Sequence, residues 1–172
     1  MDSYLATWAV LSPGISKLRA DGVEVTTNLC IDGEWPLRPD QRFLLRLACQ
    51  CVLSNARDAV ADGPERRVHI TAAEFNGVLH LTIADSGPGI PRNVLPSVFA
   101  PFYTTRPDRM GLGLPICRAA LAALAGTVHV AATGQAGTVL AIRAPVRALT
   151  LDTRQPSQHH APCEAVLAEA IA

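Results

Sequence analysis

Two glycines with polar and basic residues before them suggest a phosphate-binding turn near the middle of the chain. Gly111 and Gly113 directly precede an apolar run, residues 114–125, that is rich in alanine and leucine. Glycine leaves backbone N–H groups accessible, and the start of a helix offers an anion further N–H donors and a positive potential. Hydroxyl groups and positive charge stand just before the glycines: Thr104, Thr105, Arg106 and Arg109. The glycine pair alone is weak evidence, because a helix entered through a flexible turn has the same pattern.

Two polar side chains stand where apolar ones are expected. Asp85 ends the core-facing register of a strand, and Gly87 and Gly89 then permit a tight loop. A carboxylate accepts hydrogen bonds, so it suits the amino group of adenine and rejects the oxo group of guanine. The alternative is a capping aspartate in a strand-end turn.

Asn55 falls on the apolar stripe of a helix, and Asp58 lies at its edge. A buried amide without a partner costs roughly 1–3 kcal/mol, so an ion, a phosphate or a backbone carbonyl should meet Asn55.

The helix that carries Asn55 is the clearest element of the sequence. It is predicted over residues 40–61, and Gly63-Pro64 ends it. Arg57 points away from the stripe and is expected to be solvated. The predicted stripe has the 3.6-residue period of a helix and consists of Phe43, Leu44, Leu47, Ala48, Cys51, Val52 and Ala59.

A hairpin follows, with Asn76-Gly77 as its turn. Pairing around this turn places Val68 beside Asp85, Ile70 beside Ile83 and Ala72 beside Leu81, all on one core-facing side. Further strands are predicted over residues 23–30 and on both sides of Gly134, and helical segments over 94–99 and 114–125. Residues 3–20 look helical but are interrupted at Ser12-Pro13-Gly14.

Size and composition indicate one folded domain of ordinary size. The chain has 172 residues, of which 49% are apolar and 17% charged, and its formal net charge is zero. A zero net charge provides no global field for nucleic acid or an anionic membrane. No apolar run reaches the length of a membrane span, and the start lacks the basic region of a signal peptide. Five cysteines without CxxC spacing predict reduced, mostly buried thiols in the cytoplasm.

In their order and spacing these places resemble the ATP-binding domain of sensor histidine kinases, which belongs to the superfamily shared with gyrase, Hsp90 and MutL. The resemblance covers residues 20–146. "LSNARDAV" resembles the family's N box, "DSGPGI" its G1 box, "FAPFYTTR" its F box and "MGLGLPIC" its G2 box, and "GQAGTVLAIRAPV" is similar to its closing strands. Each box alone is weak, but five in register are specific.

The resemblance implies an α/β two-layer sandwich of the Bergerat type, with helices covering one face of a mixed, mostly antiparallel sheet. Residues 1–20 would be a helical lead-in, 21–147 the ATPase domain, and 148–172 a linker with a short C-terminal helix.

The resemblance also assigns roles within the site. Asn55 would coordinate Mg²⁺ that bridges the phosphates, and Asp85 would bind the adenine amino group with support from Thr138. Residues 99–106 would belong to a mobile lid, and Arg106 could meet the γ-phosphate. Asn55 and Arg106 would be catalytic. The full implied ATP-binding set is Asn55, Asp58, Asp85, Gly87, Gly89, Ile90, Phe102, Thr104, Thr105, Arg106, Gly111, Leu112, Gly113, Leu114 and Thr138.

Two residues depart from the family pattern. Arg109 occupies the place of the first glycine of the family's GxGxG turn, where it would clash with the phosphates or add a charge to them; we expect weakened but retained ATP binding. Cys51 lies one turn before Asn55, where gyrase-like ATPases carry a glutamate that activates water. A cysteine of ordinary pKa does not supply that base, so phosphotransfer is favoured over hydrolysis.

The family's phosphoacceptor histidine is the third departure. It precedes the ATP-binding domain, whereas no histidine here lies before residue 69. We therefore expect the catalytic domain of a two-component kinase, which transfers the γ-phosphoryl group to a histidine on a separate or missing dimerisation segment and so acts on a response regulator indirectly. The alternatives are a stand-alone regulator of the anti-sigma serine kinase type and a degenerate nucleotide-binding scaffold.

Overall fold

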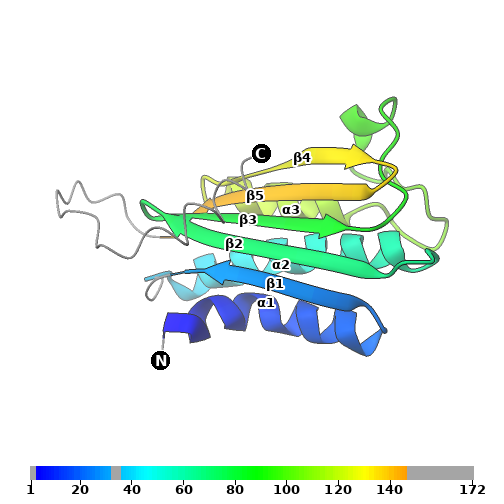
Figure 1. Ribbon diagram of the computed structural model, residues 1–172. Coiled ribbons are helices and arrows are strands. Elements are labelled where there is room, and N and C mark those ends of the chain that lie inside the picture. The colour runs from blue at the N-terminus through cyan, green and yellow to red at the C-terminus, as the bar shows by residue number, and fades with distance from the viewer. Residues whose placement is uncertain (1–2, 32–35, 147–172) are drawn as a thin grey trace.

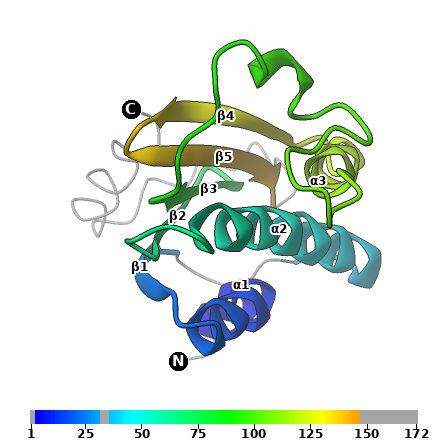
Figure 2. The same ribbon diagram turned by 90° about the vertical axis from the view of Figure 1, so that its right-hand side faces the viewer.

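The computed structural model describes residues 3–31 and 36–146. In these ranges five strands form one sheet of order β1-β2-β3-β5-β4, and α1, α2 and α3 all lie on one of its faces (Figures 1 and 2). β1 is parallel to β2 and the other neighbours are antiparallel, which confirms the predicted two-layer α/β sandwich. The elements are α1 (Ser3–Ala20), β1 (Glu24–Cys30), α2 (Pro39–Val60), β2 (Arg67–Phe75), β3 (Val78–Asp85), the short 3-10 helix η1 (Leu95–Ser97), α3 (Gly113–Ala122), β4 (Thr127–Gly134) and β5 (Gly137–Pro145).

The hairpin of β2 and β3 has the register that the sequence predicts. Val68 lies opposite Asp85, Ile70 opposite Ile83 and Ala72 opposite Leu81. Both turn residues, Asn76 and Gly77, have positive φ (50° and 75°), as a tight two-residue hairpin turn requires. This register places the Asp85 side chain on the face that the helices cover.

Helix α2 has nearly its predicted bounds, but its predicted buried face is only partly right: Ala48 and Val52 are buried, and Leu44, Leu47 and Cys51 are partly buried. Phe43 is 64% exposed, whereas the fully buried positions are Leu45, Ala48, Cys49, Val52, Leu53, Ala56 and Val60. The reason is that α2 lies between α1 and α3 as well as on the sheet, so its buried face is wider and rotated from the predicted stripe. Asn55 and Asp58 consequently lie beside the buried stripe and are half-buried.

Helix α1 runs without interruption through Pro13, contrary to the predicted break. A proline inside a helix costs about 3 kcal/mol, but α1 buries Val10, Leu11, Ile15 and Leu18, each contributing roughly 1.5–3 kcal/mol. Gly14 allows this packing, since a Cβ there would lie 2.4 Å from Leu53 Cδ1. Burial against α2 therefore outweighs the proline.

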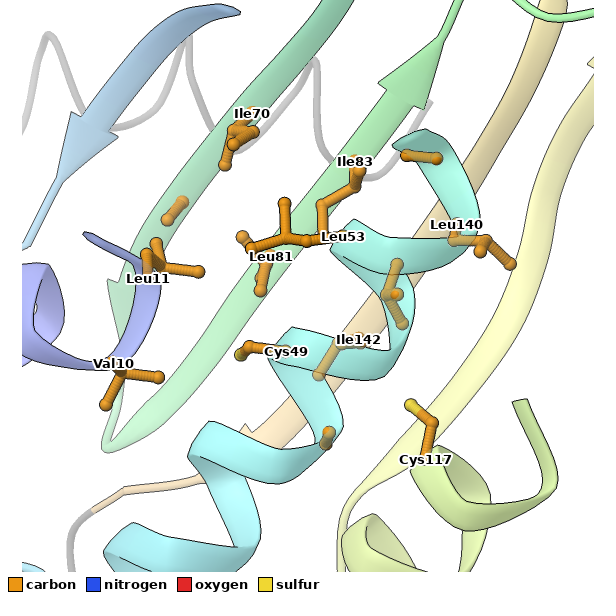
Figure 3. Close-up of a cluster of buried hydrophobic side chains, with 14 of the residues drawn as sticks. Val10, Leu11, Cys49, Leu53, Ile70, Leu81, Ile83, Cys117, Leu140 and Ile142 are labelled. Carbon is orange, nitrogen blue, oxygen red and sulfur yellow. The ribbon is translucent and has the colours of Figure 1, made fainter. Parts of the chain in front are cut away.

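The core lies between the sheet and the helices, where Leu53 from α2 packs with Leu81 and Ile83 from β3 (Figure 3). Cys49 and Cys117 are buried free thiols in this core, and burial raises the pKa of Cys49 to about 12. Cys30 is disulfide-bonded, so the prediction of reduced cysteines is wrong at that position.

None of the helices in the described ranges is long and apolar enough to span a membrane. Residues 148–172, predicted as a linker and helix, lie outside the described residues.

Candidate functional site

The predicted site residues come from α2, from the end of β3 with the loop after it, and from the segment of residues 99–112, which we call the lid segment. On α2, Cys51, Asn55 and Asp58 follow one another at helical spacings and so lie along one side, and Asp62 lies in the turn just after the helix. Arginines of the lid segment reach this side at Asp58. The loop after β3 reaches the same helix, because Gly87 lies against Ala59.

Asp85 is a buried carboxylate with one oxygen fixed by the backbone. Asp85 is only 6% exposed. The N–H groups of Gly87 and Thr138 donate to Oδ1 at 2.9 and 3.3 Å. Burial raises the pKa of Asp85, and these two hydrogen bonds offset the shift only in part. Among the described residues no group donates to Oδ2, so this oxygen is available to a donor from a ligand.

The loop that follows Asp85 is held against its neighbours so closely that side chains would not fit. A Cβ on Gly87 would lie 2.8 Å from Asp85 Oδ1 and 2.9 Å from the Cβ of Ala59. Gly89 has a φ of +77°, and a Cβ there would lie 2.1 Å from the Gly134 carbonyl oxygen. These glycines therefore fix where Asp85 stands between α2 and the β4–β5 hairpin.

Thr133 also holds this loop, although it was not among the residues predicted from the sequence. Its hydroxyl oxygen accepts a hydrogen bond from the Ile90 N–H at 2.6 Å and lies 3.4 Å from the Thr138 hydroxyl. Thr133 stands opposite Thr138 in the β4–β5 pairing. Pairing the two strands around a turn between Gly134 and Gly137 would have placed these threonines together, so the signal was present in the sequence.

Backbone contacts determine the path of the lid segment. The N–H of Phe102 donates to the Gly111 carbonyl at 3.1 Å, and both residues have positive φ (64° and 67°). A Cβ on Gly111 would lie 2.5 Å from the Tyr103 carbonyl oxygen, so this glycine is required by the lid itself. Thr104 closes a local turn, in which its hydroxyl pairs with the backbone N–H and carbonyl of Arg106.

The remaining predicted residues of this region are placed differently. The Phe102 side chain is 75% exposed and Leu114 is buried in the core, so a ligand in the site would meet Leu114 only through its backbone. Thr105 is exposed and Leu112 is half-buried. Gly113 begins α3, and nothing lies within 4 Å of the position that a Cβ would occupy. Its N–H group and open surroundings suit an anion at the helix start.

Three arginines surround Asp58, and none of these contacts was predicted from the sequence. Arg109 donates to Asp58 Oδ1 at 2.7 Å, and Arg106 donates to the Asp58 carbonyl oxygen at 2.5 Å. Arg57 also donates to Oδ1, at 3.2 and 3.3 Å, and lies 3.7 Å from Asp21. The prediction that Arg57 is solvated is wrong, because its side chain is only 15% exposed.

Asn55 is suited to a magnesium ion that arrives with phosphates. In the described part of the chain no group hydrogen-bonds to its side chain, so its amide oxygen is available. The described residues contain no cluster of three His, Cys, Asp or Glu side chains that could hold a metal ion by themselves. Magnesium is commonly held by one or two protein oxygens together with water and substrate phosphates, and the single oxygen of Asn55 fits that arrangement.

Cys51, one turn before Asn55, is half-buried, and burial raises the pKa of its thiol. The thiol is thus protonated at neutral pH and is no general base. A cavity of about 230 Å³ lies next to Asp85, and its lining residues are Glu24, Thr26, Arg67, Val68, His69, Ala84, Asp85, Ser86 and Ala136.

The fold and the sequence together define the class of protein. Residues 40–148 match the model of the histidine kinase-, DNA gyrase B- and HSP90-like ATPases, and the chain belongs to this family. Within the family it is similar to sensor kinases. The C4-dicarboxylate transport sensor protein DctB of Rhizobium meliloti (strain 1021) is 36% identical over 91 residues, which are 53% of this chain and 14% of the relative.

Two further similarities agree with that class. DctS of Rhodobacter capsulatus, also a C4-dicarboxylate transport sensor protein, is 30% identical over 144 residues, covering 77% of this chain and 22% of the relative. The structure of the mycobacterial sensor histidine kinase MprB matches with a TM-score of 0.66 and 25% identity, covering 82% of this chain and 96% of that one. The chain thus spans less than a quarter of the two curated relatives. It is an ATP-binding catalytic domain of the sensor histidine kinase type.

Proposed function

We propose that this domain binds ATP with Mg²⁺ and transfers the γ-phosphoryl group to a histidine on a helical dimerisation segment, from which a response regulator is phosphorylated. Such a domain works in the cytoplasm, where ATP is available. The observation that carries the proposal is the state of Asp85: one oxygen is fixed by two backbone N–H groups and the other is available to a ligand. A buried acceptor of this kind selects a base that presents an amino group.

The residues of the site divide the work. Asp85 would accept a hydrogen bond from the adenine amino group, while Thr133 and Thr138 hold the loop beside it. Asn55 would hold Mg²⁺, which would neutralise charge on the phosphates. Backbone N–H groups at the start of α3 and the guanidinium of Arg106 would stabilise the γ-phosphoryl group during in-line attack. Phosphoryl transfer requires mainly positioning and electrostatic stabilisation from the protein.

Cys51 favours transfer to a side chain over hydrolysis. Activation of water needs a base within reach of the γ-phosphate, and a thiol whose pKa is raised by burial does not provide one. The attacking group would therefore be supplied by the partner segment.

The alternatives gain no specific support. The chief argument for a degenerate scaffold is that Arg109 would clash with bound phosphates. In the structure, however, its guanidinium donates a hydrogen bond to Asp58 Oδ1 at 2.7 Å. The relatives reported above are sensor proteins, which favours a kinase over an anti-sigma regulator.

Thermal unfolding with and without nucleotide tests the proposal. A ligand at 100 times its Kd stabilises the folded state by about 2.7 kcal/mol, so saturating Mg²⁺-ATP should raise the Tm, and the same concentration of Mg²⁺-GTP should raise it much less. An unchanged Tm with Mg²⁺-ATP would contradict nucleotide binding and leave the scaffold.

A further inference from the structure

We propose that Asp58 and Arg109 form a latch that holds the lid segment on α2, and that a bound triphosphate competes with Asp58 for Arg109. The competition with a bound triphosphate rests on the proposed function. The latch itself concerns the protein alone and is tested without nucleotide.

The ion pair of the latch is short and joins distant parts of the chain. Arg109 donates to Asp58 Oδ1 at 2.7 Å, which is the short end of the range for a charge-assisted hydrogen bond. The side chain of Asp58 is 19% exposed and that of Arg109 is 43% exposed, so water screens the ion pair only in part. Fifty-one residues separate them, and the contact fastens the lid segment to the C-terminal part of α2.

A second arginine supports the same attachment. Arg106 donates to the Asp58 carbonyl oxygen at 2.5 Å and lies 3.4 Å from an Asp62 carboxylate oxygen. Apolar anchoring is concentrated at the start of the segment, where Phe99 packs against the core, whereas Phe102 and Met110 are both 75% exposed. A segment with few buried apolar contacts opens at low cost in free energy. The polar contacts with α2 therefore have a large share in its position.

Asp58 is a fixed partner, whereas Arg109 is a movable one. Arg57 holds Asp58 Oδ1 from the inner side and is itself mostly buried beside Asp21. Arg109 projects from an exposed loop, and a guanidinium pairs with a phosphate in the same planar manner as with a carboxylate. A triphosphate seated near Asn55, one turn before Asp58, would repel Asp58 and attract Arg109. Nucleotide and Asp58 thus compete for one cation.

The latch follows from this chain's own sequence. The family pattern has a glycine at the place of Arg109, and a glycine has no side chain with which to reach α2. The competition consequently gives Arg109 a role different from the two considered from the sequence, which were steric clash and simple added charge.

Hydrogen exchange of the lid amides, measured by mass spectrometry without nucleotide, tests the latch. Asp58→Asn and Arg109→Gln should each speed exchange in peptides covering residues 99–112 by roughly two- to fivefold, as expected for a partly exposed ion pair. The double variant should exchange no faster than the faster single variant. Arg92→Gln is the matched control, because Arg92 is exposed and has no ion pair among the described residues; it should change nothing.

Equal exchange in wild type, Arg109→Gln and Arg92→Gln would overturn the latch. Arg109→Gln removes only a partly exposed side chain, so it keeps the test valid if Asp58→Asn destabilises the domain; thermal unfolding of each variant checks this.

Calorimetry with the ATP analogue AMPPNP and Mg²⁺ tests the competition. Asp58→Asn should bind roughly two- to fivefold more tightly and Arg109→Gln more weakly than wild type. Unchanged or weaker binding by Asp58→Asn would overturn the competition. Lid exchange that changes as predicted in a protein that binds no nucleotide would support the latch and refute the proposed function, so the two failures are distinguishable.

Discussion

Replacement of Asp85 by asparagine should separate nucleotide recognition from folding. An asparagine oxygen can still accept from the N–H groups of Gly87 and Thr138, which now donate to Oδ1 at 2.9 and 3.3 Å. The other side-chain atom changes from an acceptor oxygen to a donor nitrogen. It would face the adenine amino group donor to donor.

The expected loss of affinity follows from that mismatch. A hydrogen bond to a charged group contributes about 1.5–3 kcal/mol, which corresponds to roughly 10- to 150-fold weaker binding of Mg²⁺-ATP. The new amide donor suits the oxo group of guanine, so the ratio of ATP to GTP affinity should fall by a larger factor than ATP affinity alone.

The same substitution should leave the fold intact or stabilise it. Burial raises the pKa of Asp85 in the folded state, so the folded state binds more protons than the unfolded state between the unfolded and folded pKa values. The contribution of Asp85 to stability is thus greatest below its unfolded pKa and is lost as the pH rises through its folded pKa. Asparagine does not ionise, so it carries no such loss of stability as the pH rises. At neutral pH the Tm of Asp85→Asn should therefore equal or exceed that of wild type.

Isothermal calorimetry with ATP and GTP, combined with thermal unfolding at pH 7, measures all three quantities. ATP binding by a folded Asp85→Asn within twofold of wild type would refute the assignment of Asp85 to the base.

Three further substitutions test the supports of the site and the core. Gly14→Ala should lower the free energy of unfolding by about 1–3 kcal/mol, since its Cβ would lie 2.4 Å from Leu53 Cδ1; adding Leu53→Ala should give less than the sum of the two losses, and additivity in denaturant unfolding would contradict the contact. Thr133→Val leaves the Ile90 N–H without its acceptor and should cost about 1–3 kcal/mol, with weaker ATP binding; unchanged unfolding and binding would argue against the role of Thr133. Cys51→Ala should leave the low rate of ATP hydrolysis unchanged, and a large decrease in phosphate release would show that the thiol takes part.

Local patterns in the sequence were sufficient to predict the β2–β3 hairpin and the position of Asp85. The alternation of residues 67–85 and the Asn76-Gly77 turn define a single register, because a shift of one residue would turn the apolar face to solvent. That register places Asp85 on the helix-covered face, as the structure shows. The bounds of α2 also follow from a local signal, since Gly63-Pro64 ends the helical pattern.

Features that depend on packing between distant elements were not predictable in this way. The buried face of α2 depends on where α1 and α3 lie, and Phe43 is exposed because neither covers it. The continuity of α1 through Pro13 depends on its contact with Leu53. The pairing of Arg57 with Asp21 and of Arg109 with Asp58 is likewise set by tertiary structure, because each pair joins distant parts of the chain.

Transfer of labelled phosphate tests the central claim most directly. The domain is incubated with Mg²⁺, [γ-³²P]ATP and the separately produced dimerisation segment of a sensor kinase, while nucleotide binding is measured in the same sample. The account predicts a labelled segment whose phosphate is stable in base and labile in acid, as expected of phosphohistidine, and much weaker labelling with Asp85→Asn at the same ATP concentration. Bound ATP with an unlabelled segment, across segments from several sensor kinases, would contradict it.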